Sequence, residues 1–168
     1  MYNATVPVFV RSLTALRAIL EKAESFVADK KIDESVVLQA RLALDQFPFV
    51  QQVQIACDNA KGTAGRLAEV EIPKMEDNEK TLAELKERID KTLAFLQSLS
   101  FEQFEGSEDR KIPIYFMPEK YLLGLEYVTD LAIPNFYFHL TTAYDILRHN
   151  GMDLGKGDYI GNLVFKDL

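Results

Sequence analysis

The sequence predicts an all-α fold: a bundle of four long helices with a small β-hairpin or an irregular insertion before the last helix. The first observation is that apolar residues recur every three or four positions over four long segments, as on the buried face of an amphipathic helix. The second is that this period is lost between the third helix and the fourth. Helices with one apolar face bury that face most readily against one another, which favours a bundle.

The first two long helices are expected at residues 6–29 and 49–69. In both segments charged residues stand between the apolar positions, so each helix has one face for the core and one for water. Between the two helices, Asp33 is expected to cap a short helical piece. That piece ends near Pro48, because proline lacks the N–H that a helix interior needs.

The third and fourth helices are expected at residues 81–98 and 134–150. Thr81 and Glu84 have the spacing of a capping box, in which two side chains satisfy free backbone N–H groups at the start of a helix. The fourth helix has a proline in its expected first turn and is followed by Gly151, where a left-handed cap would fall.

The insertion at residues 100–132 contains two segments, 111–116 and 120–125, that are rich in isoleucine, tyrosine and leucine. They predict a small hairpin with its turn around residues 117–119. Residues 152–168 hold glycines as well as apolar residues, so we expect them to pack as irregular chain.

The linker of residues 70–80 predicts the direction of the helices. At about 3.3 Å per residue it can span roughly 36 Å. That span exceeds the length of the third helix at about 1.5 Å per residue, so the linker can cross the bundle and leave the second and third helices parallel. Gly62 and Gly65 weaken the second helix, and a close approach by a neighbouring helix explains them better than a break.

Composition and charge limit the function. A chain of 168 residues with 48% hydrophobic residues can bury a full core, so we expect one domain over residues 1–168. The formal charge of −7 and the lack of a basic tract argue against nucleic acid and anionic membranes as partners. No apolar run approaches about 20 residues, so no membrane span is expected. The lone Cys57 excludes an internal disulfide and, without a signal-peptide layout, fits the cytoplasm.

Both histidines, His139 and His149, lie on the expected fourth helix. Ten residues place them roughly 15 Å apart along the axis, so they cannot share one metal ion. His149 follows Arg148 in the last turn, where positive charge complements the helix dipole. His139 has apolar neighbours, and two interpretations stay open: a core-edge histidine with a polar partner, or a pocket group that binds a ligand or moves a proton.

We expect His139 to point into the bundle, within hydrogen-bonding or water-bridging reach of the second helix, where its partner would be Gln54, Cys57, Asp58 or Lys61. Gln54, Asp58 and Lys61 form a polar line with helical spacing. Gln54 is expected to look inward. Asp58 and Lys61 have the spacing of a surface ion pair, which is the favoured interpretation for Lys61. Cys57 is interpreted as a small buried hydrophobe, since no neighbouring histidine in the sequence could activate its thiol.

Two segments carry a family resemblance: QIACDNAKG at residues 54–62 and PNFYFHLTTAYDILRHNG at residues 134–151, with Gly155 and Lys156 just after. With these segments the chain resembles the DinB/YfiT-like superfamily, and within it an uncharacterised bacterial subfamily. The resemblance implies an up-down-down-up four-helix bundle and makes a homodimer an expected partner arrangement. It also implies a metal site of three histidines, one on the second helix and two spaced four apart on the fourth.

The resemblance places the metal-site positions at His139, at Asn135 and near Gln54, so one histidine of three is kept. Amide side chains are poor ligands for zinc or nickel, and we therefore expect no bound metal and no cofactor. The former metal site is expected to form a polar pocket for an unknown small molecule. The candidate pocket residues are His139, Asn135, Gln54, Asp58, Cys57 and Thr142.

Three functions stay open at this point. The first is the metal-free pocket. The second is a metal-dependent hydrolase or thiol transferase, in which Asp58 or Cys57 replaces a lost metal ligand. The third is a non-catalytic interaction protein that acts as a homodimer. The sequence does not decide whether the protein is an enzyme.

Overall fold

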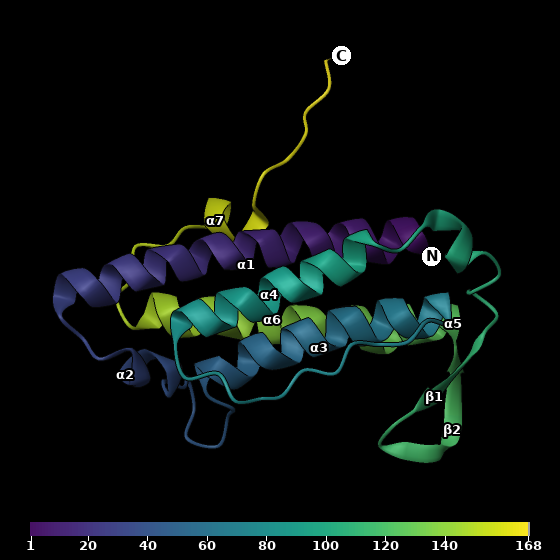
Figure 1. Cartoon of the computed structure of the whole chain (residues 1–168), viewed down its shortest axis with the longest axis horizontal. Coiled ribbons are helices and arrows are strands. Elements are labelled where there is room, and N and C mark those ends of the chain that lie inside the picture. Colours follow the sequence, from purple (N-terminus) through teal and green to yellow (C-terminus); the bar gives the residue numbers. More distant parts are fainter. Residues whose placement is uncertain (168) are drawn as a thin grey trace.

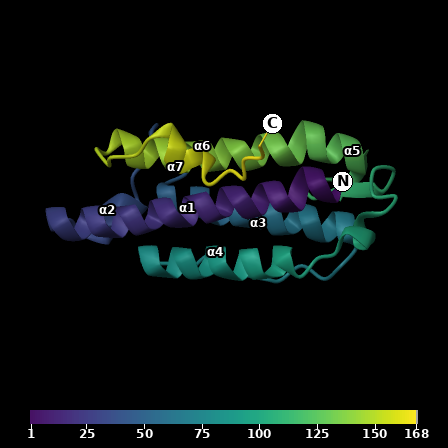
Figure 2. The ribbon, with the colours of Figure 1, turned by 90° about the horizontal axis from the view of Figure 1, so that it is seen from above.

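Four long helices dominate the structure, a computed structural model that describes residues 1–167. They are α1 (Tyr2–Lys30), α3 (Phe49–Ala68), α4 (Leu82–Gln97) and α6 (Ile133–His149). The four helices lie side by side along the long axis of the molecule (Figure 1; Figure 2). In Figure 1, α1 and α6 run in one direction, and α3 and α4 run in the other. The predicted mostly helical class with a small hairpin is confirmed.

The core lies where the apolar faces of these helices meet. α3 packs against α6 and α4, and α1 packs against α4, α3 and α6. Phe9 of α1 and Phe136 of α6 are fully buried, with ring centroids 4.7 Å apart. No helix within residues 1–167 combines the length and the apolar character needed to cross a membrane. The apolar periodicity of the sequence therefore corresponds to burial against neighbouring helices.

Both predicted helix caps are present. The Glu84 N–H donates to Thr81 Oγ1 at 3.1 Å, and the Thr81 N–H donates to a carboxylate oxygen of Glu84 at 3.2 Å. Asp33 accepts from the N–H of Ser35 at 2.8 Å and starts α2 (Glu34–Leu38). These side chains satisfy N–H groups that have no partner inside the helix.

The fourth helix starts earlier than predicted. The chain is already helical in α5 (Gly124–Glu126) and in η2 (Tyr127–Ala132), a π-helical segment that leads directly into α6. Pro134 therefore lies inside a longer helical run rather than at its start. Because Pro134 has no N–H to donate, the regular hydrogen-bond ladder is interrupted at this point, and the wider π-helical turn lies just before it.

The predicted hairpin is confirmed, but its turn lies two residues earlier. Strand β1 (Lys111–Ile114) pairs antiparallel with β2 (Met117–Leu123). Ile114 is the partner of Met117, so the turn consists of Tyr115 and Phe116. The sequence prediction placed the turn at the proline that follows Met117, whereas that proline is accommodated at the exposed start of β2.

The last residues only partly match the prediction of irregular packed chain. They include a short helix, α7 (Lys156–Ile160), which lies along α1 and is joined to it by a 2.7 Å ion pair between Asp158 and Lys22. Met152 and Leu154 are buried. The tail segment, residues 162–167, instead leads away from the helices and is exposed (Figure 1).

Arg88 of α4 holds the crossover, residues 70–80, against the bundle. The crossover runs back along the helices from the end of α3 to the start of α4 (Figure 1). The Arg88 side chain is 1% exposed, and its Nη2 lies 2.8 Å from carboxylate oxygens of both Asp58 and Asp77. Its Nη1 lies 2.8 Å from Glu79 Oε1. One buried cation therefore links α3, α4 and the crossover.

Two further contacts fix the crossover on α3. Lys61 Nζ donates to the Pro73 carbonyl at 2.8 Å and lies 2.9 Å from Asp58 Oδ1. The Lys61 side chain is 7% exposed, so the predicted ion pair exists but its lysine is buried rather than on the surface. A Cβ at Gly65 would lie 2.4 Å from Ile72 Cγ1. Gly65 thus makes room for the crossover, whereas the sequence interpretation expected a neighbouring helix there.

Replacing the buried guanidinium should destabilise the fold strongly. We expect Arg88→Met to lower the free energy of unfolding by an amount near the lower end of about 3–5 kcal/mol, since three carboxylates lose their cation but two of them stay partly hydrated. Urea denaturation measures this. The control is Lys86→Met, which removes the partly exposed pair with Glu24 and should cost less than about 1 kcal/mol. Equal losses in both variants would contradict the role of Arg88.

Candidate functional site

His139 is buried and has a polar partner on α3. Its Nδ1 lies 2.7 Å from Gln52 Oε1. Gln52 Nε2 donates to the Phe47 carbonyl at 2.8 Å, so the Gln52 oxygen is the acceptor and the Nδ1–H of His139 is the donor. The prediction that His139 faces the second helix is correct. The predicted partners are wrong: they were Gln54, Cys57, Asp58 and Lys61.

The wrong partner results from the angular position of Gln54. Two residues correspond to about 200° on a helix, so Gln54 and Gln52 lie on nearly opposite sides of α3. Gln54 is buried as predicted, but its Nε2 donates to Glu79 Oε2 in the crossover at 2.7 Å. Asp58 likewise faces Arg88 rather than His139.

The residues around His139 do not fit a transition metal. Its Nδ1 is used by the amide oxygen of Gln52, and Gln52 occupies the side of α3 where a helix-two ligand would have to lie. Amides are poor ligands for zinc or nickel. Within residues 1–167, no group of three or more His, Cys, Asp or Glu side chains is placed to hold a metal ion.

Cys57 and Thr142 are also occupied by structural roles. Cys57 is fully buried, and burial raises the pKa of its thiol to about 12, so the thiol stays protonated at neutral pH. Its predicted role as a small buried hydrophobe is confirmed. Thr142 Oγ1 donates to the Phe138 carbonyl one turn earlier at 2.7 Å. Neither side chain is available to a ligand.

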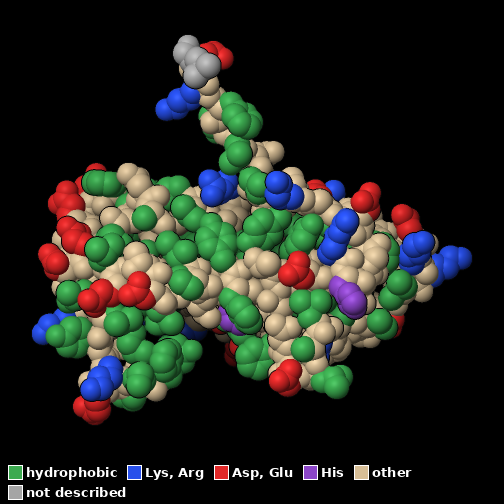
Figure 3. Space-filling model, turned by 180° about the vertical axis from the view of Figure 1, so that it is seen from behind, with side chains coloured by type: hydrophobic (Ala, Val, Ile, Leu, Met, Phe, Trp, Pro, Cys, Tyr) green, Lys and Arg blue, Asp and Glu red, His purple; other side chains and the backbone are tan. Residues whose placement is uncertain are grey.

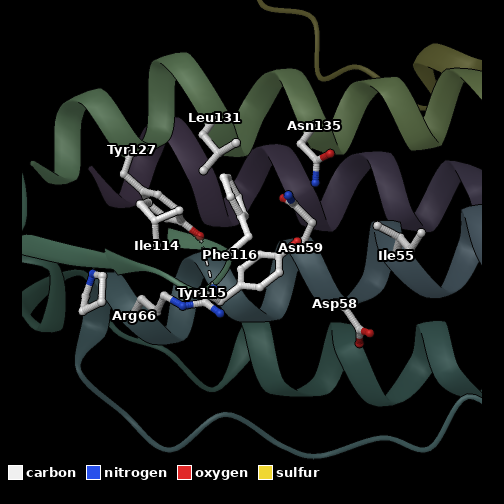
Figure 4. A pocket seen from close by; sticks show the side chains of 11 residues that line it. Ile55, Asp58, Asn59, Arg66, Ile114, Tyr115, Phe116, Tyr127, Leu131 and Asn135 are labelled. Carbon is white, nitrogen blue, oxygen red and sulfur yellow. Dashed lines mark hydrogen bonds between the residues drawn. The ribbon is translucent and has the colours of Figure 1, made fainter. Parts of the chain in front are cut away.

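A cavity of about 340 Å³ lies between α3 and the helical run that contains α6. We call it the α3–α6 cavity (Figure 4). Of the predicted pocket residues, only Asn135 and Asp58 line it, and the pocket therefore lies about one turn away from His139. The lining residues are Ile55, Asp58, Asn59, Arg66, Pro113, Ile114, Tyr115, Phe116, Tyr127, Leu131 and Asn135.

The apolar part of the lining comes from three separate elements. Ile55 belongs to α3, Leu131 to η2 and Ile114 to β1. The hairpin turn adds Tyr115 and Phe116, whose rings meet edge to face at 5.0 Å. These two side chains are 83% and 57% exposed, so aromatic surface at the cavity is left in contact with water. An apolar ligand would cover it.

The polar part of the lining has unused hydrogen-bonding capacity. The amides of Asn59 and Asn135 point toward one another across the cavity (Figure 4). Asn59 Oδ1 is buried and has no hydrogen-bond partner within the described residues. Arg66 Nη1 donates to Tyr127 Oη at 3.2 Å, and Thr63 Oγ1 lies 3.4 Å from the same oxygen. A buried acceptor without a partner is costly, and a ligand that donates to it would remove that cost.

Arg66, Tyr127 and the two residues of the hairpin turn line the cavity but are not among the pocket residues predicted from the sequence. Asn59 and Arg66 are seven residues apart, and this places them on one face of α3 two turns from each other. That spacing is a signal that the sequence carries. The position of the hairpin turn over α3 carries no such signal, because it depends on the course of the whole insertion.

The family described as "Domain of unknown function (DUF1993)" matches residues 1–160. The chain belongs to this family. A solved structure of a DinB family member protein from Shewanella denitrificans is 46% identical in sequence to this DUF1993 chain, with a TM-score of 0.95. The match covers 99% of this chain and 95% of that one, and it confirms the DinB-like resemblance. No curated protein matches the chain.

The buried imidazole should make the stability of this DUF1993 protein depend on pH. Burial lowers the pKa of His139 from its ordinary value of 6.5. The unfolded state then binds a proton more readily than the folded state, so the contribution of neutral His139 is present above about pH 6.5 and is lost as the pH falls below it. We expect His139→Gln to flatten the free energy of unfolding between about pH 7 and pH 5, measured by urea denaturation at each pH.

The control for this measurement lies on the same helix. His149 is exposed in the last turn of α6, and His149→Gln should not flatten the slope. A slope that survives in His139→Gln and disappears in His149→Gln would contradict the assignment.

Proposed function

We propose that this protein binds a small organic molecule in the α3–α6 cavity without using a transition metal. The supporting observation is a cavity within the usual size range of ligand pockets, about 300–1,000 Å³, that holds the unpartnered oxygen of Asn59. The scaffold is a DinB-like four-helix bundle that acts as one domain. In such bundles, sites are built from side chains on facing helices, as they are here from α3 and α6.

The surroundings of His139 support a binding function over metal-dependent hydrolysis. The enzyme hypothesis needs Asp58 or Cys57 as a replacement ligand beside His139. Asp58 is engaged by Arg88 and Lys61, and the Cys57 thiol is buried and protonated. His139 therefore acts as a structural residue that sets the distance between α3 and α6, and the ligand occupies the neighbouring turn.

Filling the cavity should abolish retention of the ligand. Asn135→Trp places an indole in the cavity, whereas Phe138→Trp places the same group on the exposed side of α6, one turn away. Both variants and the unmodified protein are purified without an affinity tag and denatured, and the released compounds are compared by mass spectrometry. We expect a compound that is enriched with the unmodified protein and Phe138→Trp but absent from Asn135→Trp.

The same samples are tested for metal by elemental analysis. A stoichiometric transition metal that is lost in His139→Gln would overturn the proposal in favour of the enzyme. Equal retention of every compound by Asn135→Trp would also overturn it. Circular dichroism is used to check that both tryptophan variants are folded. We expect both to fold, because the cavity has room for one indole and the other lies on the exposed side of α6.

Self-association is a second function, favoured by the tail segment. Leu163, Val164 and Phe165 are 46%, 93% and 85% exposed, and Figure 3 shows hydrophobic side chains of this segment standing clear of the body. Where the tail leaves the helices, beside Gly161, a trough of about 490 Å³ runs along α1, and its apolar lining includes Pro7, Val10 and Ala15. The tail of a second copy would bury its apolar side chains in this trough, and the exchange would be reciprocal in a symmetric dimer.

Removing the apolar side chains of the tail should yield monomers. We expect the unmodified chain to be a dimer in light scattering after size-exclusion chromatography and the double variant Val164→Ser, Phe165→Ser to be a monomer. Leu44→Ser is the control, because Leu44 is fully exposed on a different loop and should not change the mass. A monomeric unmodified chain at all concentrations tested would contradict this function.

A further inference from the structure

Arg66 brings a positive charge to the α3–α6 cavity that no carboxylate balances. Its Nη1 donates to the neutral hydroxyl of Tyr127, and no acidic side chain in residues 1–167 lies within ion-pair distance of it. Asp58, the one acidic residue of the lining, is held by the cations of Lys61 and Arg88. The cavity therefore has an uncompensated cation at one end, in a protein whose formal charge is −7.

Gly62 makes the position of this guanidinium possible. A Cβ at residue 62 would lie 2.7 Å from Arg66 Nη1, and the next atoms it would meet also belong to that guanidinium. The missing side chain lets Arg66 fold back along α3 toward Tyr127 instead of extending into water. The Tyr127 oxygen accepts from Arg66, which leaves its own O–H free to donate to Thr63 or to a ligand.

The other end of the cavity needs a hydrogen-bond donor. Asn59 Oδ1 is buried without a partner, and it lies on the same face of α3 as Arg66, whose guanidinium reaches back to Gly62, three residues from Asn59. Between Arg66 and Asn59, the lining is apolar or aromatic, with Ile114, Phe116 and Leu131 (Figure 4). A ligand that matches the cavity would therefore carry an anionic group, an apolar body and a hydrogen-bond donor, in that order.

We propose that the ligand is an amphiphilic carboxylic acid whose carboxylate binds Arg66 and the Tyr127 hydroxyl, and whose far end donates a hydrogen bond to Asn59. This inference rests on the proposed binding function and names the class of ligand for it. The guanidinium fork matches a carboxylate in shape, and hydrogen bonds to ionised groups are about twice as strong as neutral ones. The apolar body lies against Phe116 and Tyr115 of the hairpin turn.

The test uses a matched set of small aromatic probes. Para-hydroxyphenylpropionate has the anion, the aromatic body and the donor in the proposed order. Its primary amide removes only the charge, tyramine reverses it, and the para-methoxy acid removes only the donor. Binding of each probe is measured by NMR titration of backbone amides. We expect the acid to bind about tenfold or more tightly than the amide, the methoxy acid to bind several-fold more weakly than the acid, and tyramine not to bind.

Two substitutions assign the charge effect to Arg66. Arg66→Met should remove the difference between acid and amide, because the positive charge that favours the acid is gone. Gly62→Ala should weaken binding of the acid by displacing the guanidinium, although alanine is the better helix former and should not weaken folding. Lys111→Met is the control: it removes one positive charge from the neighbouring hairpin, outside the cavity, and should leave all affinities unchanged.

The outcomes separate this inference from the proposed function. Equal binding of acid and amide, or a difference that survives in Arg66→Met, would overturn the carboxylic acid but leave a cavity that binds ligands. Binding of no probe would overturn the inference, and the proposed function would then depend on the compounds released by the unmodified protein. Loss of both the probes and the released compounds would overturn the two together.

Discussion

The structure depends on the burial of one guanidinium, that of Arg88. A crossover that runs the length of the bundle has few apolar residues with which to hold itself in place, and this cation replaces them by joining Asp77 and Glu79 to α3 and α4. The same contact engages the carboxylate of Asp58. Together with Lys61, it engages the one carboxylate of the cavity lining, which leaves the charge of Arg66 unbalanced. The burial of Arg88 therefore affects both the fold and the electrostatics of the cavity.

Most of the fold could be predicted from the sequence because its determinants are local. Apolar spacing gave the long helices, and the capping box at Thr81 gave the start of α4. The errors lie where a distant contact decides. Pro134 is a local signal for a helix start, yet the π-helical η2 continues the helix on its N-terminal side. The crowding at Gly65 comes from Ile72 of the crossover, which a helix pattern cannot reveal.

The candidate site was less predictable, since an error of two residues, about half a helical turn, changes which side chains meet. His139 was placed correctly on the core face of α6, but its partner is Gln52, and the cavity lies beside Asn135. The family resemblance predicted a site at His139. The unbalanced charge of Arg66 is visible only when the partners of Asp58 are known, and those include Arg88, thirty residues away in the sequence.

The hairpin turn affects the shape of the cavity but has little effect on the stability of the fold. Tyr115 and Phe116 form part of the cavity wall, yet both are largely exposed and contribute little to the core. Exposed positions tolerate substitution with changes in stability of about 0.5 kcal/mol or less. Mutations in this two-residue turn can therefore alter the shape of the cavity while the bundle keeps its stability. A lineage of such proteins can change this cavity without passing through unfolded intermediates.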